Sequence, residues 1–199
     1  MDEEGSRLMG QNTKGEKTKE LLIECAASLF LQNGYNATGI NDILNAAGLS
    51  KGSFYFCFSS KKELAGEVAE YYSKNKLKEL ARLAEEKKTW GPFVEAVACN
   101  VIENARQQKS FGCPLAVLGM EIAFLEPDLS LKYYTCLRGI ADVFAEVLRK
   151  SGVPEEKAAA LADQALAIYE GHLLFYRISK DIHELEKLLE QMKPIAQVQ

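Results

Sequence analysis

The 199-residue sequence has few of the side chains from which catalytic and metal sites are built. Its two histidines have no metal-binding spacing, and its five cysteines form no CxxC pair. It also has no phosphate-binding glycine loop, no GxSxG sequence and no grouping that resembles a catalytic triad. We therefore expect a protein that binds no metal or other cofactor and is not an enzyme.

Long apolar runs are missing too. No stretch of about 18 apolar residues is present, and the polar N-terminus does not have the pattern of a signal peptide. The odd, scattered set of cysteines is typical of reduced thiols. These features predict a cytoplasmic protein with no membrane partner.

An excess of positive charge is also absent, since 24 Lys and Arg residues face 28 Asp and Glu residues. A protein that coats nucleic acid non-specifically would normally be strongly basic. One segment is locally basic, with six bases against four acids: Lys14, Lys17, Lys19, Lys51, Lys61 and Lys62 against Glu16, Glu20, Glu24 and Asp42. Any binding to DNA must therefore depend on individually placed contacts and on dimerisation.

The most informative segment runs from Thr38 to Phe58 and has the pattern of two short helices joined by a tight turn. The first helix would place these apolar residues on one face: Ile40, Ile43, Leu44 and Ala47. Thr38 is placed to cap that helix, Gly48 can adopt the positive φ that ends it, and Ser50 can cap the second helix. Phe54 and Phe58 are expected to point inward. This pattern predicts a helix-turn-helix, and an ordinary helical hairpin in a bundle is the alternative.

The flanking residues complete a small domain. Thr18 to Gly34 is expected to form one helix with an apolar stripe and a terminal glycine. Ser60 to Glu63 has the sequence of a capping box and opens a helix from Lys61 to about Glu86. We divide the chain into residues 1–62 and 63–199, and expect the small N-terminal core to lean on the rest of the chain.

The segment from Leu29 to Leu64 closely resembles the N-terminal DNA-binding domain of TetR-family transcriptional regulators. The matching residues are Gly34-Tyr35, Thr38-Gly39-Ile40, Ile43, Ala47-Gly48-Leu49-Ser50-Lys51-Gly52, Phe54-Tyr55, Phe58 and Ser60-Lys61. The resemblance implies an all-α fold, in which an N-terminal three-helix helix-turn-helix domain is joined by a long helix to a C-terminal helical ligand-binding and dimerisation bundle. We expect a repressor that a small hydrophobic or electrophilic effector releases from its operator. The alternative is a helical small-molecule-binding or scaffold protein without specific DNA binding.

The second helix of the motif is expected to lie in the major groove of double-stranded DNA. The expected DNA-binding residues are Thr38, Ser50, Lys51, Gly52, Ser53, Tyr55, Phe56 and Lys61. Lys51 and Ser53 can donate hydrogen bonds to bases, and the Thr38 hydroxyl suits a phosphate. Tyr55 and Lys61 resemble family positions that hold the DNA backbone, although Tyr55 could instead be a half-buried packing residue.

Two further features concern the DNA backbone. Lys14, Lys17 and Lys19 could form an arm along it or a solvated, frayed tail. Cys57 departs from the family pattern, which usually has a tyrosine or histidine there. Because a thiol is a poor hydrogen-bond donor, we expect that phosphate contact to be missing.

Beyond Leu64 the sequence predicts helices only. They are separated at Trp90-Gly91-Pro92, Phe111-Gly112-Cys113-Pro114, Glu126-Pro127-Asp128 and Gly152-Val153-Pro154. Ala165 to Ile178 is apolar all round, so this helix must be covered on more than one face. We expect a second subunit on one face, since the last two helices of the family usually form a four-helix dimer interface; a central helix of a monomer is the alternative. The expected dimer contacts are Leu161, Ala165, Ile168, Gly171, Phe175 and Leu188, and a homodimer would read a palindromic operator.

A ligand pocket is expected among the middle helices. Its candidate residues are Phe93, Val97, Cys113, Met120, Phe124, Tyr133, Phe144, Tyr169, His172 and Tyr176. An apolar or aromatic small molecule would suit them, although aromatic residues at this spacing could equally be plain core. His172 could orient the ligand or be a hydrogen-bonded core histidine. Cys113, at a predicted helix N-terminus, could be a reactive sensor of electrophiles or an inert packing residue.

Overall fold

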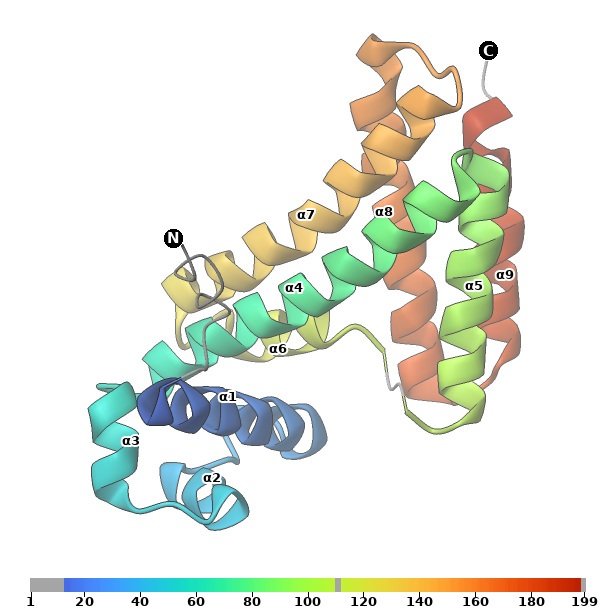
Figure 1. Cartoon of the computed structure of the whole chain (residues 1–199). Helices are drawn as coiled ribbons and strands as arrows, with labels where there is room; N and C mark the ends of the chain where they lie inside the picture. The colour runs from blue at the N-terminus through green and yellow to red at the C-terminus, as the bar shows by residue number, and fades with distance from the viewer. Residues whose placement is uncertain (1–12, 110–111, 198–199) are drawn as a thin grey trace, which may run out of the picture.

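The computed structural model of the chain describes residues 13–109 and 112–197 (Figure 1). Regular structure in these residues is entirely helical, which confirms the all-α fold. The helices are α1 (Lys14–Asn33), α2 (Ile40–Ala47), α3 (Lys51–Cys57), α4 (Lys61–Lys87), α5 (Trp90–Arg106), α6 (Pro114–Ile122), α7 (Pro127–Lys150), α8 (Glu155–Ser179), α9 (His183–Met192) and a 3₁₀ turn η1 (Lys193–Gln197). Among these helices, none has the length and apolar character needed to cross a membrane.

The first three helices form a separate group, from which α4 leads away (Figure 1). Their core consists of almost completely buried side chains from all three helices: Leu22, Phe30, Ile43 and Phe54. Gly48 ends α2 in the left-handed conformation, with φ of 65°, which glycine adopts without strain. Ser50 caps α3 by accepting a hydrogen bond from the backbone amide of Ser53. The predicted turn and the cap of the second helix are therefore confirmed.

α4 is continuous across position 62 and packs against α1, α5 and α7. Ser60 caps it by accepting a hydrogen bond from the Glu63 amide. The Glu63 carboxylate accepts from Ser59 instead of Ser60, so the reciprocal half of the predicted capping box is displaced by one residue. A single helix that packs on both groups couples the position of one to the other.

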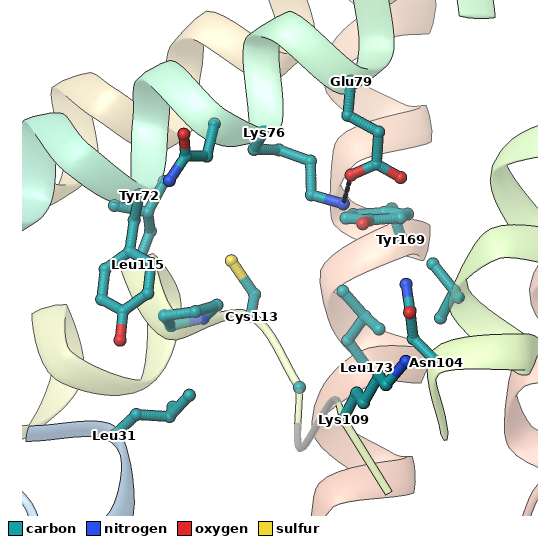
Figure 2. A pocket seen from close by; sticks show the side chains of 14 residues that line it. Leu31, Tyr72, Lys76, Glu79, Asn104, Lys109, Cys113, Leu115, Tyr169 and Leu173 are labelled. Carbon is teal, nitrogen blue, oxygen red and sulfur yellow. Dashed lines mark hydrogen bonds and ion pairs between the residues drawn. The ribbon is translucent and has the colours of Figure 1, made fainter. Parts of the chain in front are cut away.

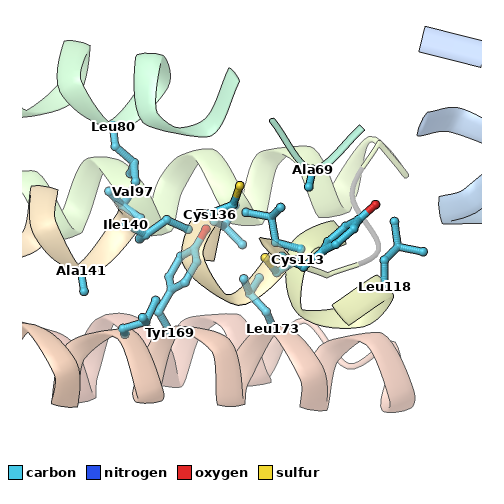
Figure 3. Close-up of a cluster of buried hydrophobic side chains, with 14 of the residues drawn as sticks. Ala69, Leu80, Val97, Cys113, Leu118, Cys136, Ile140, Ala141, Tyr169 and Leu173 are labelled. Carbon is cyan, nitrogen blue, oxygen red and sulfur yellow. The ribbon is translucent and has the colours of Figure 1, made fainter. Parts of the chain in front are cut away.

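The remaining helices share one apolar core. Figure 3 shows part of it, to which Leu80 of α4, Val97 of α5, Ile140 of α7 and Leu173 of α8 contribute. Four aromatic rings continue it, with centroids 5.7 to 6.0 Å apart in successive contacts: Trp90, Phe93, Phe144 and Tyr169. The indole N–H of Trp90 donates to the carbonyl of Met192 at 2.8 Å and ties α5 to α9.

The N-terminal boundary differs from the expected one. α1 begins at Lys14 because Thr13 and Glu16 form a capping box. Lys14, Lys17 and Lys19 therefore belong to a helix, and the frayed tail is wrong for these three residues. The rest of the expected N-terminal arm, residues 1–12, lies outside the described residues, as does Phe111 of the junction before α6.

Two other expected helix starts are corrected. The N-cap of α2 is Gly39, whose amide donates to the Asp42 carboxylate at 2.8 Å, so Thr38 is not the cap. The Thr38 hydroxyl turns back and donates to the carbonyl of Gly34 at 2.7 Å, which closes the loop before the helix. Trp90-Gly91-Pro92 forms the first turn of α5, where a proline is tolerated, and does not precede that helix.

Candidate DNA interface and internal cavity

α3 presents one face to solvent and anchors the other. Phe54 and Phe58 are buried against the three-helix core, whereas Lys51 and Gly52 are exposed. The hydroxyls of Ser50 and Ser53 lie 3.1 Å apart at the start of the helix. The anchored phenylalanines fix the helix axis, and the exposed residues of its first turn are small, polar or cationic.

Two aromatic side chains extend this exposed face. Tyr55 is 58% exposed and meets the Phe54 ring edge-on, with centroids 5.3 Å apart, so it is not a half-buried packing residue. Phe56 is 80% exposed and lines a shallow hollow between α3 and the first turns of α1. The hollow is lined by Lys14, Gly15, Thr18, Ser50, Gly52, Ser53 and Phe56. The N-terminal ends of α1 and α3 therefore form one continuous surface.

Thr38 is not available on that surface. Its side chain is 1% exposed, and its hydroxyl is already used inside the loop, so the expected phosphate contact from this hydroxyl is wrong. Lys61 lies close behind the same loop. Its ammonium donates to the carbonyls of Tyr35 and Thr38 at 2.9 and 3.0 Å and lies 4.3 Å from the centre of the Tyr35 ring. In this conformation Lys61 holds the α1–α2 loop with two of its three donors.

The same loop is also bound from α6. The carboxylate of Glu121 accepts hydrogen bonds from the amides of Tyr35 at 3.0 Å and Asn36 at 2.8 Å. Gly34 has φ of 89°, and a Cβ there would lie 3.0 Å from both Glu121 oxygens. The glycine therefore provides both the turn conformation and the room for the carboxylate. Sequence reasoning missed Glu121, because nothing in a sequence links residues 85 positions apart.

A cavity of about 280 Å³ lies among α4, α5, α6 and α8 (Figure 2). Its lining includes apolar residues, aromatic rings and amides: Leu31, Tyr72, Asn75, Lys76, Glu79, Val101, Asn104, Lys109, Gly112, Cys113, Pro114, Leu115, Tyr169 and Leu173. The Lys76 ammonium pairs with Glu79 at 2.9 Å, and the Asn100 amide donates to the same carboxylate at 3.1 Å. Burial alone would lower the pKa of Lys76, but Tyr169 and Glu79 raise it. Lys76 is therefore a charged and paired group of the cavity wall.

A second hollow, of about 170 Å³, lies between α6 and α8. Its lining is mostly apolar and includes Ala116, Val117, Met120, Gly171 and Leu174. The two spaces share Gly112, Cys113 and Leu173, which form the wall between them.

Only part of the expected pocket is found in these two spaces. Cys113 and Tyr169 line the cavity, and Met120 lines the hollow. The other buried candidates line neither and are packed core: Phe93, Val97, Tyr133, Phe144, His172 and Tyr176. Phe124 is 97% exposed beyond the end of α6, so its assignment to an enclosed pocket is wrong. His172 lies 3.3 Å from the Glu184 carboxylate, as expected of a hydrogen-bonded core histidine.

Cys113 is the N-cap of α6, as the Cys-Pro sequence predicts. Its thiol is buried, and burial together with the nearby Glu170 raises its pKa. A raised thiol pKa leaves little thiolate, which is the nucleophilic form. The structure therefore favours the packing residue over the electrophile sensor.

Glu170 of α8 has a buried carboxylate that lacks a hydrogen-bond partner among the described residues. Burial raises its pKa to about 7, against smaller opposing effects of the Cys113 thiol and the Lys76 ammonium. Sequence reasoning treated Glu170 only as an interruption of an apolar helix.

The expected dimer residues fall into two groups. Ala165 and Leu188 are fully buried within the protomer, because α9 packs against α5 and α8, so neither can meet a partner. Leu161, Ile168 and Gly171 are partly exposed, and Phe175 is 53% exposed. Beyond α4, every large hydrophobic residue that is exposed in the described chain lies between α6 and the end of α8: Met120, Phe124, Leu125, Leu131, Tyr134, Phe175 and Ile178.

Comparison with known sequences identifies both halves of the chain. Residues 22–68 match the family described as bacterial regulatory proteins, tetR family. Residues 92–191 match the C-terminal domain described as transcriptional regulator LmrA/YxaF-like. The chain is 29% identical to the HTH-type transcriptional regulator YxaF of Bacillus subtilis, over 88% of this chain and 93% of that protein. It is 28% identical to the HTH-type transcriptional regulator LmrA of the same organism, over 82% of this chain and 88% of that protein.

Solved structures share the fold. A TetR-family regulator from Cytophaga hutchinsonii superposes with a TM-score of 0.83 at 21% identity, covering 94% of this chain and 97% of that one. The reduced form of NemR from E. coli superposes with a TM-score of 0.80 at 23% identity, covering 89% of this chain and 95% of that one.

The buried carboxylate of Glu170 should make stability depend on pH. Because folding raises its pKa from 4.5 to about 7, the native state resists losing this proton, and its contribution to stability falls as the pH rises through 7. Between pH 5 and pH 8 the free energy of unfolding of Glu170→Gln should gain about 2 to 3 kcal/mol relative to the native protein, as measured by urea denaturation. Glu156→Gln, at an exposed position of the same helix, should show no such gain. A constant difference for Glu170→Gln would contradict the prediction.

Proposed function

Because the chain belongs to the TetR family of bacterial transcriptional regulators, we propose that it is a repressor that binds a palindromic operator as a homodimer and is released by a small hydrophobic effector. The observation that carries the proposal is the exposed first turn of α3, held in place by Phe54 and Phe58 behind it. Acting on chromosomal DNA, such a repressor would work in the cytoplasm. The alternative of an electrophilic effector is not supported, because burial raises the pKa of the Cys113 thiol.

In the proposed complex, α3 enters the major groove with its N-terminal residues at the base edges. Lys51 and Ser53 donate hydrogen bonds there, while Gly52 allows the backbone to approach. Tyr55 and the N-terminal turns of α1, with Lys14 and Thr18 at the surface, lie beside the phosphates. The segment that forms this surface has only a small excess of positive charge, so the two α3 helices of a dimer would act together.

We propose that α7 and α8 form the dimer interface. Leu161, Ile168, Gly171 and Phe175 follow one another at helical spacing on α8, and their exposure leaves an apolar stripe in contact with solvent. Leu131 and Tyr134 are exposed on α7. Two antiparallel helices from each subunit would form a four-helix interface in which α7, and not α9, accompanies α8.

We further propose that α6 connects the effector to the DNA-binding helices. Its first residue follows Cys113 in the cavity wall, and Glu121 near its other end binds the α1–α2 loop. Cys113 and Glu121 are eight positions apart, so the helix between them spans about 12 Å. A ligand that displaces the cavity end would shift the carboxylate and, with it, the loop before α2. The boundary at residues 62 and 63 then separates a DNA-binding domain from a ligand-binding domain. α4 is the second helix, after α6, that connects them.

The base contact of Lys51 can be tested directly. Lys51→Ala should weaken binding to the DNA upstream of the gene by about 1 to 3 kcal/mol, the usual cost of a lost base contact. Fluorescence anisotropy at fixed salt measures the change. Lys78→Ala, which removes an exposed lysine in the second half of α4, is the matched control and should bind as the native protein does. Equal affinities for both variants would contradict the role of α3.

The dimer interface yields a second test. Phe175→Glu should leave the fold intact, since the side chain is exposed, but should place a charge in the interface and produce monomers. Analytical ultracentrifugation at micromolar protein detects the change, and operator affinity should fall with it. Leu21→Glu, at an exposed apolar position of α1, should remain dimeric. A dimeric Phe175→Glu protein would exclude this face.

The coupling through α6 predicts a local change in hydrogen exchange. Glu121→Gln removes the charge and offers one acceptor for two donors, so the amides of Tyr35 and Asn36 should exchange faster. Mass spectrometry of peptides that cover this loop measures the rate. Glu126→Gln removes the ion pair with Lys62 and should leave these two amides unchanged. Unaltered exchange in Glu121→Gln would mean that the carboxylate does not hold the loop.

A further inference from the structure

The buried carboxylate of Glu170 lies beside the space proposed for the effector. It belongs to the lining of the hollow between α6 and α8, and neither of its oxygens has a hydrogen-bond partner in the described chain. A carboxylate in such surroundings is costly unless a hydrogen-bond donor or an opposite charge reaches it. Among the described residues no charged group makes a hydrogen bond to Glu170, and the Cys113 thiol beside it is only a weak donor.

The titratable groups around Glu170 do not supply that partner. Lys76 of α4 reaches it only through its field, because the ammonium is bound to Glu79 and also interacts with Tyr169. Cys113, facing it from α6, is a neutral thiol and a weak donor. Arg177 of α8 lines the same hollow. Lys109 lines the adjoining cavity. None of these three cations makes a hydrogen bond to the Glu170 carboxylate.

The available space suits a small apolar molecule that bears one polar group. The cavity and the hollow lie on either side of Gly112, Cys113 and Leu173. Apart from Glu170, Arg177 and Cys113, the hollow is lined by alanine, valine, leucine, methionine and glycine. A ring system would fill the apolar part and its substituent would reach the carboxylate.

We propose that the effector is a hydrophobic amine, whose protonated nitrogen pairs with Glu170 while its apolar body occupies the space beside Cys113 and Leu173. This inference rests on the proposed function, in which a ligand in this region releases the protein from DNA. An ammonium group both donates hydrogen bonds and neutralises the buried charge, whereas a hydroxyl group only donates. An acid would place a second negative charge beside Glu170, and the Lys76 ammonium nearby is already paired with Glu79.

Three probes with one skeleton test the proposal on the full-length protein: 1-naphthylmethylamine, 1-naphthalenemethanol and 1-naphthoic acid. Isothermal titration at pH 8 should show the amine binding at least about tenfold more tightly than the alcohol or the acid, as one ion pair in a buried site allows. Glu170→Gln should reduce amine affinity by about tenfold and leave the alcohol unchanged. Glu156→Gln should alter neither affinity. The amine should also release the native protein from its upstream DNA, and should release Glu170→Gln less effectively.

The comparison of the three probes on the native protein needs no variant and stands even if Glu170→Gln folds poorly. Equal affinity for the amine and the alcohol, tighter binding of the acid, or no binding of any probe below millimolar concentration would overturn the proposal. An amine preference that survives Glu170→Gln would also overturn it, because the charge would then be recognised elsewhere. If the native protein binds its upstream DNA but shows no amine preference, this inference fails and the proposed function stands; if it binds no DNA, the proposed function fails.

Discussion

Opposite charges bind the loop between α1 and α2 from two sides, and the placement of the DNA-binding helices depends on this arrangement. The Lys61 ammonium holds the carbonyls of Tyr35 and Thr38, and the Glu121 carboxylate holds the amides of Tyr35 and Asn36. Charge-assisted hydrogen bonds are roughly twice as strong as neutral ones, so the loop is a well-defined link between the two parts of the chain. Because α2 and α3 follow this loop directly, a shift in α4 or α6 would re-aim α3.

The cavity lies beside the middle of α4 and the start of α6. Lys76 and Tyr72 reach it from α4, and Cys113 and Leu115 reach it from the start of α6 (Figure 2). A ligand there would therefore act on both helices that hold the loop. Glu170, in the lining of the adjoining hollow, adds a chemical basis for selecting the ligand, since a buried carboxylate without a hydrogen-bond partner favours an occupant that neutralises it. The residues that recognise the ligand would then lie next to those that transmit its binding to the α1–α2 loop.

Local chemistry made the DNA-binding half predictable. A glycine in the left-handed conformation, a serine cap and two inward phenylalanines act over a few residues, so Gly48, Ser50, Phe54 and Phe58 could be assigned from the sequence. Thr38 could not, because its hydroxyl can cap a helix or close a loop, and only the fold decides. The dimer face was partly wrong for a related reason: apolar residues all round α8 do not show which side its own subunit covers. Ala165 and Leu188 lie on the covered side.

The cavity lay beyond sequence reasoning, because aromatic spacing identifies buried residues but not the gaps between them. Phe93, Phe144 and Tyr133 were correctly expected to be interior, yet they fill space instead of lining it. The proposed function depends on two α3 helices that bind DNA together. Titrating the protein onto the DNA upstream of its gene at several salt concentrations tests this most directly. We predict two protomers per site and an affinity that falls linearly with the logarithm of salt concentration while still exceeding that for random DNA. Binding of single protomers, or equal affinity for random DNA, would contradict it.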